Sequence, residues 1–217
     1  GAVFYHHGYT FNPLVFCGAV GIGPKDCHPI EPTPGDRIIV IGGRTGRDGL
    51  RGATFSSLTM DAQTGEVAGA SVQIGDPITE KGLIEVIEHA RDAKLYNAVT
   101  DCGAGGLSSA IGEMGKNLGA SVDLSKVSLK YSGLSPWEIW LSEAQERMVL
   151  AVSPHNIASL SKICENYWVE WIDIGTFTSS GRLQVYHGDT PVVDLDNGFL
   201  HSCPRRQLNA VVFNQSP

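Results

Sequence analysis

The segment Asp101–Leu107 (D-C-G-A-G-G-L) combines residue types that hold phosphate groups and divalent metal ions. A carboxylate ends a predicted strand, and glycines lead directly into the N-terminus of a predicted helix. Backbone N–H groups at a helix start attract anions, and Gly103, Gly105 and Gly106 would let a phosphate approach them closely. The Asp101 carboxylate is a hard oxygen ligand of the kind that Mg²⁺ takes beside a substrate phosphate. The spacing alone is equally compatible with a helix cap and close packing.

A second glycine-rich segment, Gly42–Gly49 (G-G-R-T-G-R-D-G), places two arginines in a predicted loop. Arg44 and Arg47 could present their guanidinium groups to an anionic ligand or to a neighbouring acidic surface. The segment does not match G-x-x-x-x-G-K-[ST], so we exclude a P-loop. A solvated turn with two surface arginines is the alternative, and the sequence leaves it open.

Two further polar segments are weaker candidates for ligand binding. Gln73 precedes a predicted helix, where its amide could hydrogen-bond a ligand or cap a turn. Glu143–Arg147 lies between a short helix and a strand, where polar side chains either reach a cleft or form a solvated ion-pair cluster.

Cys102 is interpreted as a small buried hydrophobic residue, because nothing like a nucleophile elbow surrounds it. The five cysteines form no C-x-x-C pair, which disfavours a zinc site.

Patterns of apolar and turn residues predict the elements that position these segments. Proline after an acceptor side chain predicts helix starts at Asp76-Pro77, Ser135-Pro136 and Ser153-Pro154, and Gly119 is interpreted as the stop of the helix after Gly106. Because several predicted strands follow one another with no helix between them, we expect an α+β fold in which helices cover a mixed sheet. The predicted strands are 37–41, 96–101, 147–152, 169–174, 183–186 and 191–195.

Composition and charge exclude several classes of protein. The 217 residues carry a formal net charge of −7 and contain no basic run, so we expect no nucleic-acid partner. No stretch approaches the roughly 20 apolar residues that span a bilayer, and the N-terminus lacks a signal-peptide pattern, so we expect no membrane partner and a cytoplasmic location.

The chain divides into two parts. Residues 1–35 are interpreted as a linker from an upstream domain, and residues 36–217 as the folded domain. The missing initial methionine is interpreted as the sign of a piece of a longer protein.

Five motifs follow one another along the chain: Asn12–Val15, Gly42–Gly49 with Gly52–Ser57, Val72–Pro77, Asp101–Leu107 and Ser142–Met148. Together they resemble the phosphoribosylformylglycinamidine synthase family, and the resemblance covers roughly residues 12–203. Members of this family are purine-biosynthesis ligases. They convert formylglycinamide ribonucleotide (FGAR), ATP and glutamine-derived ammonia to the corresponding amidine (FGAM), ADP and phosphate.

The resemblance implies a fold and a set of site residues. The implied fold is a three-layer α/β/α domain with a mixed sheet, like the C-terminal domain of aminoimidazole ribonucleotide synthetase. Gln73 and the segment Glu143-Ala144-Gln145 would bind FGAR, Asp101 would bind one Mg²⁺, and ATP would be the co-substrate. Ala144 departs from the serine that is expected in many relatives, so only a backbone contact with the substrate could remain there.

The resemblance also implies partners. The general base, the ATP-contacting residues and further Mg²⁺ ligands would belong to an upstream ATP-binding domain, and other synthetase domains and a glutaminase domain or subunit would complete the enzyme. This chain would then hold no catalytic residue and be inactive alone. One alternative is a domain of another superfamily member: aminoimidazole ribonucleotide synthetase, thiamine-phosphate kinase or selenophosphate synthetase. The other is a non-catalytic interaction domain whose glycine loop packs against a partner subunit.

Overall fold

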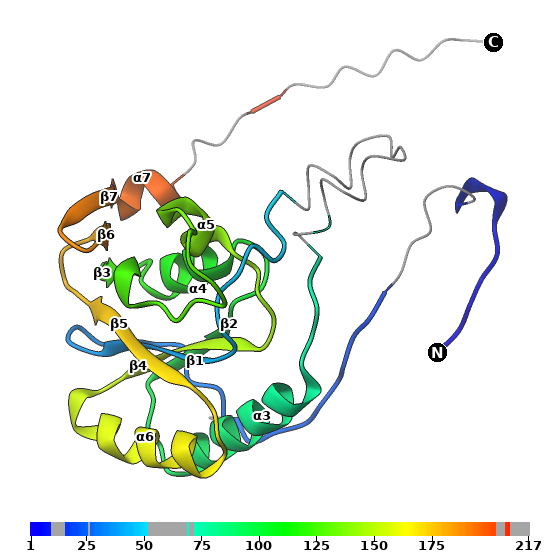
Figure 1. Ribbon diagram of the computed structural model, residues 1–217, viewed down its shortest axis with the longest axis horizontal. Coiled ribbons are helices and arrows are strands. Elements are labelled where there is room, and N and C mark those ends of the chain that lie inside the picture. The colour runs from blue at the N-terminus through cyan, green and yellow to red at the C-terminus, as the bar shows by residue number, and fades with distance from the viewer. Residues whose placement is uncertain (10–15, 26, 52–68, 70–71, 203–206, 209–217) are drawn as a thin grey trace.

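A seven-stranded mixed sheet with the strand order β2-β4-β1-β5-β3-β6-β7 forms the middle layer of the protein (Figure 1). The computed structural model describes residues 1–9, 16–25, 27–51, 69, 72–202 and 207–208. The motifs Asn12–Val15 and Gly52–Ser57 lie outside these described residues. The strands are β1 (Arg37–Gly42), β2 (Ala98–Asp101), β3 (Ala120–Asp123), β4 (Arg147–Val152), β5 (Trp171–Phe177), β6 (Arg182–His187) and β7 (Thr190–Asp196). The helices are η1 (His7–Tyr9), α3 (Pro77–Asp92), α4 (Gly106–Met114), η3 (Leu124–Lys126), α5 (Pro136–Leu141), η4 (Pro154–Asn156), α6 (Ile157–Asn166) and α7 (Asn197–His201).

The central strand β1 pairs only with strands that come much later in the chain. Arg37 is opposite Val152 of β4 on one side and Thr176 of β5 on the other, and both pairings are antiparallel. The pair β3–β6 is parallel, whereas β2–β4, β3–β5 and the hairpin β6–β7 are antiparallel. This arrangement confirms the predicted mixed sheet.

Helices cover both faces of the sheet, and the side chains of the central strands alternate between the two faces. Ile38 and Val40 of β1 pack in the cluster that includes α4 and α5, and Ile39 and Ile41 pack in the cluster that includes α3 and α6. Successive strand residues point to opposite faces, so a strand covered on both sides is apolar throughout. The result is the three-layer α/β/α fold, with α4 and α5 on one side and α3 and α6 on the other (Figure 1).

Two helix starts are built as the sequence predicts. The Asp76 side chain accepts a hydrogen bond from the Ile78 N–H (3.0 Å), and Pro77 occupies the first turn of α3. At α5, the Ser135 N–H and hydroxyl both donate to Glu138 Oε2, at 2.8 and 2.9 Å. These side chains satisfy groups that a helix terminus leaves without intrahelical partners.

Several boundaries differ from the prediction. Helix α4 ends at Met114 instead of continuing to Gly119. The Asn197 side-chain amide donates to the carbonyl oxygens of Gly115 (3.0 Å) and Lys116 (3.2 Å) and so satisfies this earlier end of the helix. The Ser153-Pro154 start leads first into η4 and only then into α6, β5 begins at Trp171 instead of residue 169, and β2 begins at Ala98 instead of residue 96. Strand β3 and helix α7 were not predicted.

The N-terminal segment contributes little to the sheet within its described residues. It contains η1, and Ile30 forms an isolated antiparallel bridge with Ala98 at the β2 edge. The linker role of residues 1–35 stays a prediction. Across the described part of the chain, no helix is both long and apolar enough to cross a membrane.

Candidate functional site

Three polar side chains that are distant in sequence form one hydrogen-bonded cluster at the N-terminus of α4. The Gln73 amide donates to Glu143 Oε2 (2.8 Å), and the Gln145 amide donates to Gln73 Oε1 (3.2 Å). The other carboxylate oxygen of Glu143 accepts the backbone N–H of Gly105 (3.1 Å), the N-cap residue of α4. The structure therefore brings together Gln73, Glu143, Gln145 and Gly105, which we predicted as candidates in three separate segments of the chain.

The glycine loop Gly42–Gly49 packs directly against this cluster. The Asp48 carbonyl oxygen accepts the Glu143 N–H (2.8 Å). Gly49 has a φ of +72°, and a Cβ added there would lie 2.5 Å from Glu143 Cβ and 2.7 Å from Gln73 Nε2. Only glycine combines this backbone conformation with such a close approach, so the loop forms a wall of the cluster.

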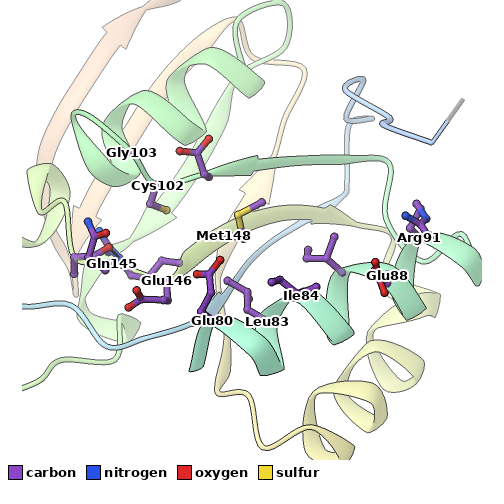
Figure 2. A pocket seen from close by; sticks show the side chains of 14 residues that line it. Glu80, Leu83, Ile84, Glu88, Arg91, Cys102, Gly103, Gln145, Glu146 and Met148 are labelled. Carbon is purple, nitrogen blue, oxygen red and sulfur yellow. Dashed lines mark hydrogen bonds between the residues drawn. The ribbon is translucent and has the colours of Figure 1, made fainter. Parts of the chain in front are cut away.

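A cavity of about 570 Å³ adjoins the cluster and runs between α3 and the ends of β2 and β4 (Figure 2). Gln145 belongs to both the cluster and the cavity wall. Figure 2 shows Gln145 and Glu146 near one end of the cavity and Arg91 of α3 near the other. Cavities of this size that combine apolar walls with a few polar groups are typical sites for small ligands. The lining residues are Glu80, Leu83, Ile84, Ile87, Glu88, Arg91, Asp101, Cys102, Gly103, Ala144, Gln145, Glu146, Arg147 and Met148.

Asp101 and Gly103 lie in the wall of this cavity, as a site that combines metal and substrate would require. The Asp101 side chain is exposed at the end of β2. Within the described ranges, no group of three or more His, Cys, Asp or Glu residues could hold a metal ion. Mg²⁺ commonly takes only one or two protein carboxylates and completes its shell with water and substrate phosphate. Asp101 therefore fits a Mg²⁺ ion that is shared with a substrate.

The two arginines of the glycine loop pair with carboxylates of the protein itself. Arg44 Nε lies 2.9 Å from the Glu170 carboxylate on the surface. Arg47 Nε donates to Glu138 Oε1 (2.7 Å), and its Nη2 donates to the Gly133 carbonyl oxygen (2.9 Å). Neither arginine lines the cavity beside Asp101, although Arg44 lines a neighbouring cavity together with Gln145.

Glu138 connects the glycine loop to the start of α5. The hydrogen bond from Arg47, followed by that from the Ser135 backbone, lowers the pKa of Glu138 from 4.5 to about 2. The carboxylate is therefore ionised at all physiological pH values. A folded-state pKa below the unfolded value means that its stabilisation is complete above pH 4.5 and is lost as the pH falls towards about 2.

We expect Glu138→Gln to lower the free energy of unfolding by about 1 kcal/mol at neutral pH, because charge-assisted hydrogen bonds are lost from a partly exposed site. The difference between the variant and the wild type should shrink as the pH falls from 4.5 towards 2. Urea unfolding of both proteins across this pH range measures this difference in the free energy of unfolding. A difference that is independent of pH would contradict the pairing with Arg47.

Cys102 is buried at the wall of the cavity, and burial raises the pKa of its thiol to about 11. The thiol is therefore protonated at neutral pH. This state agrees with the interpretation of Cys102 as a small hydrophobic residue, because the thiolate is the nucleophilic form.

Arg147 was predicted as the last residue of the polar segment Glu143–Arg147, with no role of its own. Its side chain is buried, and burial lowers its pKa. Nε donates to the Ala144 carbonyl oxygen (3.0 Å), Nη1 to Thr45 Oγ1 (2.9 Å) and Nη2 to the Ser142 carbonyl oxygen (2.5 Å). The available signal was an arginine at the start of the otherwise apolar strand β4. The predicted alternative of a solvated ion-pair cluster does not describe this arginine.

Ala144 lines the cavity, but its backbone polar groups have partners inside the protein. Its N–H donates to Ser142 Oγ (3.2 Å), and its carbonyl oxygen accepts from Arg147. The predicted backbone contact with a substrate at Ala144 would therefore require one of these hydrogen bonds to be replaced.

A family model described as AIR synthase related protein, C-terminal domain, matches residues 33–188. The chain belongs to this family. The chain is 38% identical over 208 residues to phosphoribosylformylglycinamidine synthase subunit PurL of Thermoplasma acidophilum. The match covers 94% of this chain and 27% of that protein. The chain thus spans about a quarter of the length of this curated relative.

Solved structures show the same similarity for this chain. Thermotoga maritima PurL complexed with FGAR aligns with a TM-score of 0.75 and 32% identity over 89% of this chain and 32% of that chain. Thermotoga maritima PurL complexed with ATP aligns with a TM-score of 0.70 and 28% identity over 88% of this chain and 30% of that chain. The resemblance to phosphoribosylformylglycinamidine synthase that the five motifs indicated is confirmed.

Proposed function

We propose that this chain is the FGAR-binding domain of a phosphoribosylformylglycinamidine synthase. The observation that carries the proposal is the convergence of Gln73, Glu143 and Gln145 beside the cavity, in a chain similar to a PurL that was solved with FGAR. FGAR contains amide groups, which need both hydrogen-bond donors and acceptors. Two glutamine amides and one carboxylate supply both kinds of partner.

In the complete enzyme, ATP would phosphorylate the amide oxygen of FGAR, and glutamine-derived ammonia would then displace phosphate. The residues of this chain would bind and orient FGAR, which is a large part of what a protein contributes to phosphoryl transfer. The upstream ATP-binding domain, the other synthetase domains and a glutaminase domain or subunit would supply the remaining groups. The proposed activity of the whole enzyme is thus that of an ATP-dependent carbon–nitrogen ligase with glutamine as the amido donor.

We propose that Asp101 holds one Mg²⁺ in this site. When bound, the ion would neutralise phosphate charge, which is a general contribution of metal ions to phosphoryl transfer. The exposed carboxylate of Asp101 and its place in the cavity wall support this assignment. The backbone N–H of Gly105 at the helix start would help to bind an anion only if Glu143 released it.

Calorimetric titration of the chain with FGAR, with Mg²⁺ or with a chelator, tests the proposal. We expect the wild type to bind FGAR and to bind it several-fold more tightly with Mg²⁺. Asp101→Asn should bind FGAR with one affinity under both conditions, because the metal ligand is gone while the side-chain shape is kept.

The matched control is Asp189→Asn, which changes an exposed aspartate in the turn between β6 and β7. It should retain the wild-type response to Mg²⁺. No FGAR binding by the wild-type chain would contradict the proposed substrate, and an undiminished Mg²⁺ response in Asp101→Asn would contradict the metal role.

A further inference from the structure

The segment from Ser142 to Gln145 alternates between buried and partly buried side chains. Ser142 and Ala144 are 0% and 1% exposed, whereas Glu143 and Gln145 are only partly buried and meet Gln73. This segment is not part of a helix or strand, so regular backbone pairing does not fix its conformation. Something else must hold Glu143 and Gln145 towards Gln73.

Every peptide group around Glu143 has a specific partner, and Arg147 supplies two of them. The peptide group between Ser142 and Glu143 is hydrogen-bonded on both sides. Its carbonyl oxygen accepts from Arg147, and its N–H donates to the Asp48 carbonyl oxygen. In the next peptide group, the Ala144 N–H donates to Ser142 Oγ. In the one after that, the Ala144 carbonyl oxygen accepts from Arg147.

A buried arginine at position 147 is energetically unfavourable for a purely structural role. Its guanidinium is buried, and its three hydrogen-bond acceptors are two carbonyl oxygens and the hydroxyl of Thr45. Among the described residues, no carboxylate forms a salt bridge with it. Burying a charge without an ionic partner is unfavourable. A planar fork that reaches three separate oxygens is, however, a geometry that lysine cannot reproduce.

We propose that Arg147 is the positioning residue of the FGAR site, and that it acts by fixing the peptide groups on which Glu143 and Gln145 are carried. The expected effect of Arg147 on FGAR affinity rests on the proposed function. Its expected effect on the position of Glu143 does not, because the Glu143 carboxylate accepts the Gly105 N–H in the protein itself. The Gly105 amide therefore reports the position of Glu143 without any ligand.

The first experiment measures hydrogen exchange of backbone amides by NMR in the 217-residue chain. In Arg147→Lys we expect the Gly105 amide to exchange at least tenfold faster relative to the Leu150 amide in the buried strand β4. A merely structural loss would accelerate both amides together, so their ratio separates positioning from global stability. Thr45→Val, which removes one of the three acceptors, should produce a smaller change in the same direction and serves if Arg147→Lys does not fold.

The matched control is Arg37→Lys. Arg37 also makes three side-chain hydrogen bonds in this sheet, to both oxygens of Asp173 and to Thr176 Oγ1, but it lies at the opposite end of β1. Its replacement should leave the ratio of Gly105 to Leu150 exchange at the wild-type value. An unchanged ratio in both Arg147→Lys and Thr45→Val would overturn the proposal.

The second experiment is a double-mutant cycle on FGAR affinity. Arg147→Lys should weaken binding about tenfold in the wild-type background and less than twofold when Glu143→Ala is already present, because the two residues act as one unit. Equal effects in both backgrounds would overturn action through Glu143. If the wild-type chain binds no FGAR, the proposed function fails, and the Gly105 measurement still decides the role of Arg147.

Discussion

Replacing Gly106 by alanine is expected to lower the free energy of unfolding by about 3 kcal/mol, the combined effect of a left-handed backbone and an overpacked contact. Gly106 has a φ of +55°, and an added Cβ would overlap the carbonyl oxygen and carbon of Ser142. Neither backbone can move freely, because Gly106 begins α4 and Arg147 holds the Ser142 carbonyl. Urea unfolding monitored by circular dichroism measures the loss.

Gly112 provides the control in the same helix. An added Cβ there would meet nothing within 4 Å, and its φ is not in the left-handed region. Gly112→Ala should therefore stabilise the protein by about 0.5–1 kcal/mol through helix propensity. A loss at Gly106 no larger than about 1 kcal/mol would show that the approach of α4 to Ser142 is not a tight constraint.

Replacing Glu143 by alanine is expected to weaken FGAR binding by about 10- to 100-fold, the usual effect of losing hydrogen bonds to a charged group. The change also removes the acceptor that orients Gln73, so two of the three cluster side chains are affected. The measurement is calorimetric titration with FGAR. Because Glu143 is only partly buried, its loss should change the free energy of unfolding far less than the binding.

The control for this prediction is Glu165→Ala, which removes an exposed carboxylate of α6 that does not line the cavity. It should bind FGAR with wild-type affinity. Equal FGAR affinity in Glu143→Ala and Glu165→Ala would show that Glu143 does not contact FGAR. Any binding would then depend on the residues of the cavity wall.

Local signals predicted individual elements well. Strand β4 has the predicted bounds, and α3 begins at the predicted proline because the capping side chain and the proline are adjacent in sequence. Strand β3 was not predicted, because it has only four residues and only Ala120 and Val122 of it face the core. The end of α4 was misplaced because its cap comes from Asn197, which lies more than 80 residues away in sequence.

The site was predictable to the extent that its residues are chemically conspicuous. Gln73, Glu143 and Gln145 were found as candidates, but their meeting at Gly105 depends on the tertiary fold. Arg44 and Arg47 were conspicuous for the same reason, although their carboxylate partners lie about 90 to 130 residues later in the sequence. Arg147 was passed over because only its burial and its three acceptors distinguish it from a surface arginine.

The strand order has a consequence for how the chain folds during synthesis. The central strand β1 leaves the ribosome before both of its partners, β4 and β5, which lie about 110 or more residues later. At typical elongation rates the apolar run 38–41 therefore waits about 5 to 20 seconds without a strand on either side. Exposed strand edges of this kind are prone to pair with other chains. We expect chains that are released before β4 to be bound by chaperones or to aggregate.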